Sequence, residues 1–383
     1  MTYLNYSQDL LKEKDAYWTA KEIQQQPACW DKVLSNLIQV QPSIDAFLKP
    51  ILAKPNLRII FTGAGTSAFV GESIAPAVCA KLGKRVEAIA TTDLVSNPHD
   101  YFQSDIPTLL VSFARSGNSP ESVASVDYAD SLVKECYQLA ITCNEEGELY
   151  KRCSGTNKFA LLMPPETNDI SFAMTSSFSS MMLSALYVFC PVENFKLQFE
   201  KSMAATESLI TRYDQIIKTV ANKKYERVIY LGSGIFKGLA REGALKLLEL
   251  TDGVAVSSFD SPLGFRHGPK AIVNDKTLVI LFISNHPLTR KYDLDLLTEL
   301  TGDSEVGEII VVDAKASEEH TGFECLFLSG MENAEDIFLL FPYIVCVQMY
   351  GFEHALAINN TPDNPSSSGT INRVVQGVNI YAL

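Results

Sequence analysis

The chain has 383 residues, of which 46% are hydrophobic and 20% are charged, a length and composition that suit an enzyme with two globular domains. Its formal net charge of −13 argues against a nucleic-acid-binding surface, and its eight cysteines, scattered without a Cys-x-x-Cys pair, predict reduced thiols in the cytoplasm and no metal site. The apolar runs are too short to span a bilayer and the N-terminus lacks a signal-peptide pattern, so we expect no membrane segment.

The first 200 residues carry helical patterns and then strands in alternation. Residues 1–50 predict a helical segment, with helices over 17–23 and 30–40 on either side of Pro27. The strands that follow alternate with helices, which indicates a parallel sheet covered on both faces. The predicted strands are 58–62, 86–90, 107–113, 137–142 and 158–163, and a long helix is predicted over 171–189.

The same pattern then returns along the chain. Residues 227–234 repeat the order of residue classes found in residues 58–65, position by position. Residues 277–284 repeat in the same way the strand that begins at Pro107. Such a repeat indicates two related α/β halves, each a doubly wound parallel sheet. The second half continues with a strand over 308–313, an apolar helix over 336–357 and an extended tail from Thr361. The predicted parts are a helical segment over 1–50 and two tandem domains over 51–204 and 205–383.

Two strand-to-helix turns of the first half carry clustered hydroxyl groups. Helix N-termini at the strand ends of a parallel sheet favour an anion, and glycine lets the backbone approach it. The spacing from Gly63 to Ala68 resembles half of a dinucleotide fingerprint, but hydroxyls on two separate loops favour a terminal monophosphate. The alternative is that these hydroxyls only cap helices. The candidate phosphate-binding residues are Gly65, Thr66, Ser67, Arg115, Ser116 and Ser119.

A charged helix and a histidine loop in the second half suggest proton transfer. Residues 241–250 predict a mostly apolar helix with Glu242, Lys246 and Glu249 on one face, and His267 follows on a loop rich in glycine and proline. A carboxylate and a histidine suit a reaction in which one base takes a carbon-bound proton and another group moves a hydroxyl proton. We expect Glu249 to be the base, because it lies in the last turn, whereas Glu242 is predicted near the helix start. The alternative is an exposed charge ladder and a histidine in a turn.

Taken together, these segments resemble the sugar isomerase (SIS) family. The two hydroxyl loops are similar to the phosphate loops of SIS domains. Residues 242–249 and 266–269 resemble the catalytic segments in the isomerase part of glucosamine-6-phosphate synthase. With residues 166–169, 171–177 and 372–378, the whole pattern is most similar to the galactosamine-6-phosphate deaminase/isomerase branch, formerly labelled tagatose-6-phosphate ketose/aldose isomerase.

The resemblance implies a fold, a reaction and roles for individual residues. It implies two tandem three-layer SIS domains that convert galactosamine 6-phosphate to tagatose 6-phosphate and ammonium through an enolamine, without a metal or organic cofactor. Glu249 would move the proton between C2 and C1, and Lys246 would contact the sugar or tune Glu249. His267 would open the sugar ring across the subunit interface of a homodimer or higher homo-oligomer, and Thr175 would join the substrate-binding residues.

The sequence also departs from the synthase at three points. Ala114 replaces the first serine of its second phosphate loop, and its tail lysine falls near Val375, so Arg373 or Asn372 would have to substitute in ring opening. A glutaminase domain with an N-terminal cysteine is missing, which favours the ammonia-releasing direction. Two other functions stay open: a plain aldose–ketose isomerase, which uses the same groups, and a sugar-phosphate sensor that binds without turnover.

Overall fold

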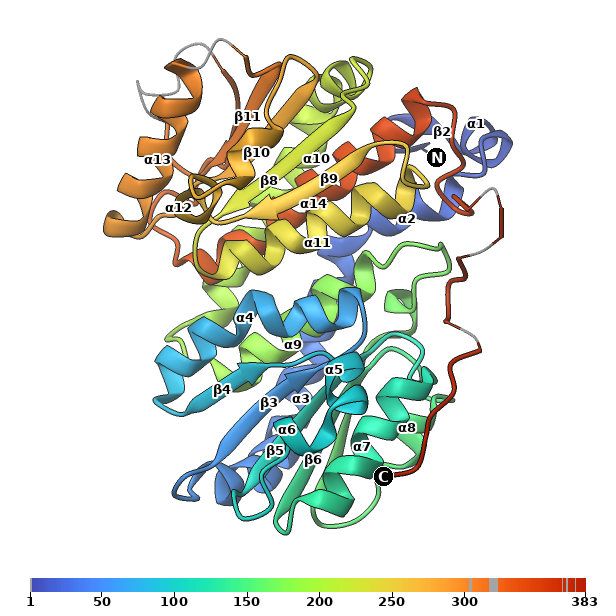
Figure 1. The fold of residues 1–383 in the computed structure, drawn as a ribbon, viewed down its shortest axis with the longest axis vertical. Helices are drawn as coiled ribbons and strands as arrows, with labels where there is room; N and C mark the ends of the chain where they lie inside the picture. Colours follow the sequence, from blue (N-terminus) through green and yellow to red (C-terminus); the bar gives the residue numbers. More distant parts are fainter. Residues whose placement is uncertain (1, 303–304, 317–322, 367, 370, 376) are drawn as a thin grey trace. The chain divides into compact units, whose positions relative to one another are not determined.

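A computed structural model describes residues 2–302, 305–316, 323–366, 368–369, 371–375 and 377–383 (Figure 1). The chain forms two compact units, and each is described by itself. The first-sheet unit consists of Ala28–Asp169, Met174–Glu193 and Thr370–Leu383. The second-sheet unit consists of Met1–Pro27, Ile170–Ala173 and Asn194–Gly369. Within the extended tail predicted from Thr361, Ser367, Thr370 and Gln376 lie outside the described residues.

This division differs from the predicted boundaries at residues 50 and 204. The first 27 residues belong to the second-sheet unit, because the carboxylate of Asp363 accepts hydrogen bonds from the backbone N–H groups of Trp18 at 2.9 Å and Thr19 at 2.7 Å. The end of the tail, in contrast, belongs to the first-sheet unit. Packing of terminal segments on a distant part of the chain leaves no local signal in the sequence. The two terminal segments were therefore predicted to belong with the parts of the chain next to them in the sequence.

The first-sheet unit is built on five parallel strands in the order β4-β3-β5-β6-β7. Strands β3 and β5 are buried along their whole length, as expected for the centre of a sheet covered on both faces. The strands are β3 (Arg58–Thr62), β4 (Arg85–Ala88), β5 (Thr108–Ala114), β6 (Cys136–Thr142) and β7 (Lys158–Leu162), each within two residues of its prediction. The helices are α3 (Gln26–Leu52), α4 (Thr66–Leu82), α5 (Thr91–Ser96), α6 (Pro98–Tyr101), α7 (Pro120–Leu132), α8 (Glu148–Lys151) and α9 (Ser176–Phe189), with a 3₁₀ turn at Pro165–Thr167.

The second-sheet unit repeats this plan, with parallel strands in the order β12-β11-β10-β8-β9. Its strands are β8 (Arg227–Gly232), β9 (Val256–Asp260), β10 (Thr277–Phe282), β11 (Glu308–Asp313) and β12 (Glu324–Phe327). Its helices are α1 (Gln8–Glu13), α2 (Tyr17–Gln24), α10 (Phe195–Ala221), α11 (Ile235–Leu250), α12 (Pro262–Phe265), α13 (Pro287–Gly302) and α14 (Asp336–Ala357). A hairpin of β1 (Thr2–Tyr3) and β2 (Tyr6–Ser7) and a 3₁₀ turn at Pro269–Ile272 complete the unit.

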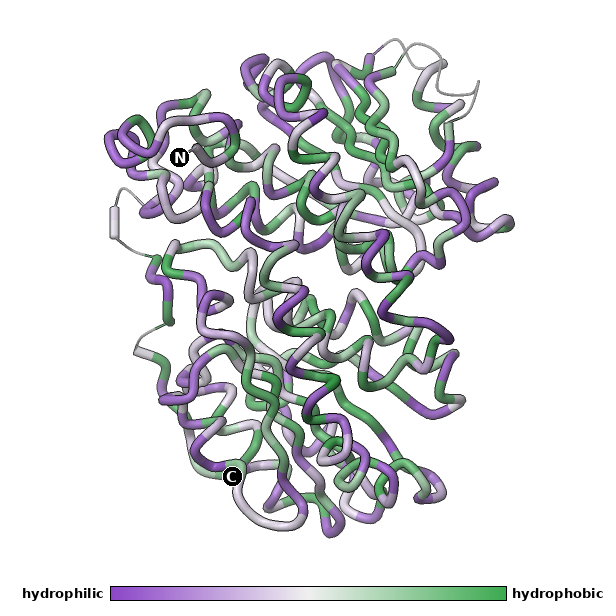
Figure 2. Tube along the Cα trace, turned by 180° about the vertical axis from the view of Figure 1, so that it is seen from behind, coloured by the Kyte–Doolittle hydropathy of each residue, from purple (hydrophilic) through white to green (hydrophobic). Residues whose placement is uncertain are grey.

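Figure 2 shows the central strands of both sheets as largely hydrophobic segments. The expectation that no stretch is long and apolar enough to cross a membrane is wrong for α14, which passes that test by length and composition. All of its apolar window is buried inside the protein, and it packs along α10 and α11. A core helix of a globular domain has these same properties, so the length of α14 serves packing.

The structure confirms the internal repeat at the level of single backbone angles. The turn after β3 has Gly65 at φ 54° and ψ −128°, and the turn after β8 has Gly234 at φ 58° and ψ −121°. Only glycine adopts this conformation without strain. A side chain at Gly63 or at Gly232 would collide with the first turn of the following helix, at 2.6 Å from Ser67 in the first case. Both helices therefore start directly against the end of a strand.

Candidate active site

The first sheet holds a small cavity at the point where its strand order reverses. Strand β4 lies on one side of the central pair β3 and β5, and β6 lies on the other. Ligands of doubly wound sheets bind at the carboxyl ends of the strands at such a point. The cavity has a volume of about 100 Å³. Its polar lining consists of Ser67, Arg115, Ser116, Ser119, Ser122 and Arg373, and its remaining lining includes Met174, Val374 and Val375.

The loop after β3 brings one hydroxyl into the cavity. Ser67 lies in the first turn of α4, is 6% exposed, and approaches the sulfur of Met174 at 3.9 Å. Gly65 is the N-cap of α4 and Thr66 its first residue, so both shape the turn and neither lines the cavity. The described N-cap of α4 has no side-chain hydrogen bond. The N-cap is a glycine, so no side chain occupies the capping position of this helix.

The loop after β5 contributes the larger share of the polar lining. The hydroxyl of Ser119 donates to that of Ser122 at 2.6 Å, one turn along α7. Ser119 occupies the N-cap and Pro120 the first turn, as predicted, but in the described structure the Ser119 side chain forms no cap. The hydroxyl of Ser116 accepts from the backbone of Asn118 at 3.3 Å. Arg115 is only 6% exposed, so a buried guanidinium lies beside the serine hydroxyls.

The segment before α9 contributes Met174 to the cavity lining and carries the carboxylate that caps the helix. Asp169 is fully buried, and its carboxylate accepts from the backbone N–H groups of Thr175 at 2.8 Å and Ser177 at 2.9 Å. This cap starts α9 at Ser176, so the prediction of a helix from residue 171 is wrong: residues 171–175 precede the helix. Thr175 is fully buried with its hydroxyl directed at Asp169, and Met174 lines the cavity in its place.

The sequence suggested Arg373 or Asn372 as a replacement for the synthase's tail lysine. The guanidinium of Arg373 donates from Nε to the carbonyl oxygen of Asp169 at 3.1 Å, and Nη2 donates to the same carbonyl. Nη2 also lies 3.4 Å from the side-chain oxygen of Asn168. A guanidinium engaged in this way keeps its charge and its N–H protons, so it suits an anchor better than a ring-opening acid. Asn372 is exposed.

The equivalent edge of the second sheet is filled by the chain's own carboxylates. Asp293 on α13 is fully buried and accepts from the Ser233 hydroxyl at 2.6 Å and from the Ser284 backbone at 3.0 Å. Asp336 accepts from the backbone of Asn285 at 2.8 Å and from the Ser284 hydroxyl. Burial raises the pKa of Asp293 to about 6 and raises the pKa of Asp336 as well. The hydroxyl and backbone N–H groups that donate to these carboxylates are therefore already bonded, and they do not form a second phosphate site at this edge.

The charged helix α11 carries a buried ion pair rather than an exposed ladder. Lys246 and Glu242 are fully buried, and the Lys246 ammonium lies 3.4 Å from Glu242. It also donates to the carboxylate of Glu249, whose side chain is 21% exposed. The helix begins at Ile235, so the prediction that Glu242 lies near its start is wrong, while Glu249 does lie in the last turn. Of the two carboxylates, only Glu249 reaches solvent.

His267 lies on the loop after α12 of the second-sheet unit. It is exposed, and its side chain forms no hydrogen bond or ion pair to any residue that the structure describes. Its neighbours are fixed more firmly: Arg266 pairs with Glu299 at 2.7 Å, and the Lys270 ammonium pairs with the same carboxylate. The loop therefore presents His267 outward from a backbone that two ion pairs restrain.

The structure thus gathers the predicted residues into separate groups. Ser67, Arg115, Ser116 and Ser119 line one cavity, Lys246 and Glu249 form an ion pair, and His267 stands outside both groups. Ser122, Met174 and Val374 also line the cavity, and they were not among the residues predicted from the sequence. The signal available for Ser122 was its spacing of three residues from Ser119, which places the two on one face at the start of a helix.

Comparison with known proteins gives a consistent assignment. The family model for the SIS domain matches residues 51–190. D-galactosamine-6-phosphate deaminase AgaS from Escherichia coli is 47% identical over 366 residues, which cover 95% of each chain. The protein of the same name from Shewanella sp. (strain ANA-3) is 45% identical over 379 residues, which cover 98% of this chain and 94% of that protein.

Solved structures agree with these relatives. The crystal structure of tagatose-6-phosphate ketose/aldose isomerase from Escherichia coli is 43% identical, with a TM-score of 0.91, and the match covers 100% of this chain and 99% of that one. The family assignment rests on three findings that agree: the family model matches across the first sheet, the relatives align over nearly the full length, and the solved structure shares the fold. The chain belongs to the SIS domain family, alongside the D-galactosamine-6-phosphate deaminases named AgaS.

Proposed function

We propose that this protein converts galactosamine 6-phosphate to tagatose 6-phosphate and ammonium. The observation that carries the proposal is the hydroxyl-lined cavity at the strand-order reversal of the first sheet, which offers serine hydroxyls and a buried guanidinium to one small anion. Relatives that are 45% and 47% identical over nearly their full length carry this activity in their names, which supports the choice of substrate.

The proposed phosphate site uses four side chains of the first-sheet unit. Ser67, Ser116 and Ser119 donate their hydroxyls to the phosphate oxygens, and Arg115 supplies positive charge where the overall charge of −13 is unfavourable to an anion. Gly65 and Thr66 shape the turn that sets the N-terminus of α4, where a helix favours an anion. Thr175 acts indirectly, because its buried hydroxyl meets the capping carboxylate of Asp169 and Met174 takes the position at the cavity.

The proposed chemistry is carried by α11 and the His267 loop. Glu249 removes the C2 proton of the open-chain amino sugar, and the electron pair of that bond forms the C1–C2 double bond of an enolamine. The π pair of the C1 carbonyl moves to its oxygen, which takes up a proton and becomes a hydroxyl group. Return of a proton to C1 gives a C2 imine, and addition of water to the imine releases ammonium and leaves the ketone of tagatose 6-phosphate. Lys246 holds the Glu249 carboxylate in place through its ion pair. His267 moves the hydroxyl proton that opens the ring.

A second candidate, plain aldose–ketose isomerisation, has support from one observation. The structural relative from Escherichia coli that is 43% identical is called tagatose-6-phosphate ketose/aldose isomerase. Both reactions begin with the same proton transfer between C2 and C1, so the residues of α11 do not distinguish them. The two differ at the imine, which only an amino sugar forms.

The exposed His267 and the surface around α11 favour a homo-oligomer that completes its site at a subunit interface. Val254 and Val256 are 67% and 52% exposed, and Leu248, one residue before Glu249, is 37% exposed. Exposed apolar side chains on and just after the helix that carries a proposed catalytic group are typical of a covered surface. We also place the protein in the cytoplasm, because all eight cysteines are free thiols.

The test is product analysis with a panel of hexosamine and hexose 6-phosphates. Incubation with galactosamine 6-phosphate should yield ammonium and tagatose 6-phosphate in equal amounts, and glucosamine 6-phosphate serves as the epimer control. Interconversion of galactose and tagatose 6-phosphates without ammonium from any amino sugar would favour the plain isomerase. Binding of these sugars without any product would identify a sensor.

A further inference from the structure

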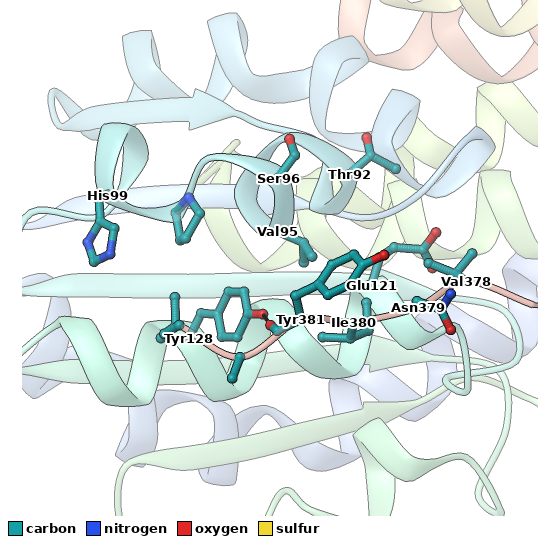
Figure 3. Close-up of a pocket in the computed structure, with 13 residues that line it drawn as sticks. Thr92, Val95, Ser96, His99, Glu121, Tyr128, Val378, Asn379, Ile380 and Tyr381 are labelled. Carbon is teal, nitrogen blue, oxygen red and sulfur yellow. Dashed lines mark hydrogen bonds between the residues drawn. The ribbon is translucent and has the colours of Figure 1, made fainter.

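The C-terminal tail of the chain forms one wall of the proposed phosphate cavity. Arg373, Val374 and Val375 line it together with Arg115 and the serines of both loops. Beyond the cavity the tail runs along α7, where the carbonyl of Tyr381 accepts a hydrogen bond from the Tyr128 hydroxyl. Figure 3 shows Ile380 and Tyr381 beside Tyr128 in a second pocket of about 670 Å³, which the tail and residues of α5 to α7 enclose. The tail is therefore held at two points of the same unit.

The first of these points is the guanidinium of Arg373. Two of its nitrogens donate to the carbonyl of Asp169, at 3.1 Å for Nε. The carboxylate of the same residue caps α9 through three backbone N–H groups, those of Thr175, Ser176 and Ser177. Because Asp169 is fully buried and bonded through both its carboxylate and its carbonyl, Arg373 is anchored to a rigid part of the unit.

The backbone of Arg373 then acts on the cavity. Its carbonyl oxygen accepts a hydrogen bond from Nη2 of Arg115 at 2.8 Å. Arg115 is 6% exposed and immediately precedes Ser116, so its guanidinium lies at the cavity and its plane is set in part by that carbonyl. A guanidinium recognises phosphate through a fixed fork of donors, so its orientation affects affinity as much as its charge does.

We propose that Arg373 is a positioning residue. Its side chain anchors the tail to Asp169 by hydrogen bonds and thereby holds Arg115 in the orientation that binds phosphate. The proposal rests on the proposed function insofar as the cavity binds a sugar phosphate. The role differs from that of a ring-opening group in the tail, because the Arg373 side chain points its donors at Asp169 and Asn168, and only its carbonyl addresses the cavity residue Arg115.

The test is a double-mutant cycle between the two arginines, with inorganic phosphate as the probe. Arg373→Ala should raise the dissociation constant of phosphate about tenfold and raise KM for the sugar phosphate more than it lowers kcat. Arg115→Ala should weaken phosphate binding at least as much. Because Arg373 acts through Arg115, the double variant should bind phosphate within about twofold of Arg115→Ala alone. Ile371→Ala, an exposed substitution in the same tail segment, is the matched control and should bind phosphate like the parent.

Three results would overturn the proposal. The first is a parent that does not bind phosphate, and the second is an unchanged dissociation constant in Arg373→Ala. The third is a double variant whose dissociation constant rises by the product of the two single fold-changes. Failure of the proposed function is read separately, from ammonium release. If the parent releases ammonium and Arg373→Ala binds phosphate like the parent, only the positioning role of Arg373 is refuted. A parent that makes no ammonium, but whose phosphate affinity follows the expected cycle, refutes only the proposed reaction.

Discussion

The buried carboxylate of Asp293 should make the folding stability of this protein depend on pH in a predictable direction. Burial raises its pKa from 3.8 to about 6, against the opposing effect of hydrogen bonds from Ser233 and Ser284 and of the Arg290 charge. Asp336 adds to the rise in the Asp293 pKa. A pKa difference of this size corresponds to about 3 kcal/mol of folding free energy, at about 1.4 kcal/mol per pH unit.

The sign follows from which state binds the proton. Between about pH 4 and pH 6 the folded protein holds a proton on Asp293 that the unfolded chain has already released, so stability rises as pH falls through this window. The cost of the buried charge is fully present above about pH 6. Asn at this position can accept from the Ser284 N–H with its oxygen and donate to the Ser233 hydroxyl with its nitrogen. Asp293→Asn should therefore keep the fold and remove this contribution.

The assay is urea denaturation of the parent and of Asp293→Asn from pH 4.5 to 7.5. The free energy of unfolding of the variant relative to the parent should increase by about 2 kcal/mol from the lower pH to the higher. Asp295→Asn replaces an exposed carboxylate on the same helix, and its profile should run parallel to that of the parent. A difference between Asp293→Asn and the parent that does not vary with pH would refute the view that an internal carboxylate replaces an anion at the second sheet.

The remaining predictions concern the proposed site. Ser67→Ala or Ser116→Ala should each weaken phosphate binding by roughly 1.5–3 kcal/mol, because a charge-assisted hydrogen bond is lost. Titration with inorganic phosphate checks this, and affinities equal to that of the parent would make these serines structural. His267→Ala should slow a closed-ring substrate far more than an open-chain analogue, as steady-state kinetics with both will show. Mixing His267→Ala with Glu249→Gln subunits should restore part of the activity, and no recovery despite proven subunit exchange would place both groups in one subunit.

The sequence was sufficient for features that depend on local pattern. Apolar strands followed by Gly-x-Gly turns predicted both sheets, because the turn at Gly65 and its copy at Gly234 require glycine backbone angles. The loop serines could also be found, since hydroxyls after adjacent parallel strands gather at one edge. The apolar helix over 336–357 was predicted with its observed bounds, because its sequence stays predominantly apolar across Pro342.

Features that depend on contacts between distant parts of the chain were not predictable in this way. Glu242 was placed near a helix start, because the charged helix was considered only from Arg241 on. In the structure the helix begins at Ile235, and Glu242 is mid-helix and fully buried. The role of Arg373 depends on a carbonyl 204 residues away, which no spacing rule reveals. The same holds for Asp293, whose importance is visible only once the ends of β8 and β10 lie side by side.

The central claim is tested most directly by the rate of ammonium release from galactosamine 6-phosphate, measured side by side for the parent, Glu249→Gln and Glu242→Gln. Glu249→Gln keeps the shape of the side chain and removes the base, so kcat should fall by about 10² to 10⁴ while phosphate affinity stays near that of the parent. Glu242→Gln changes the other carboxylate near Lys246 and should affect stability more than turnover. Ammonium release by Glu249→Gln at the parent's rate, or none by the parent, would contradict the account.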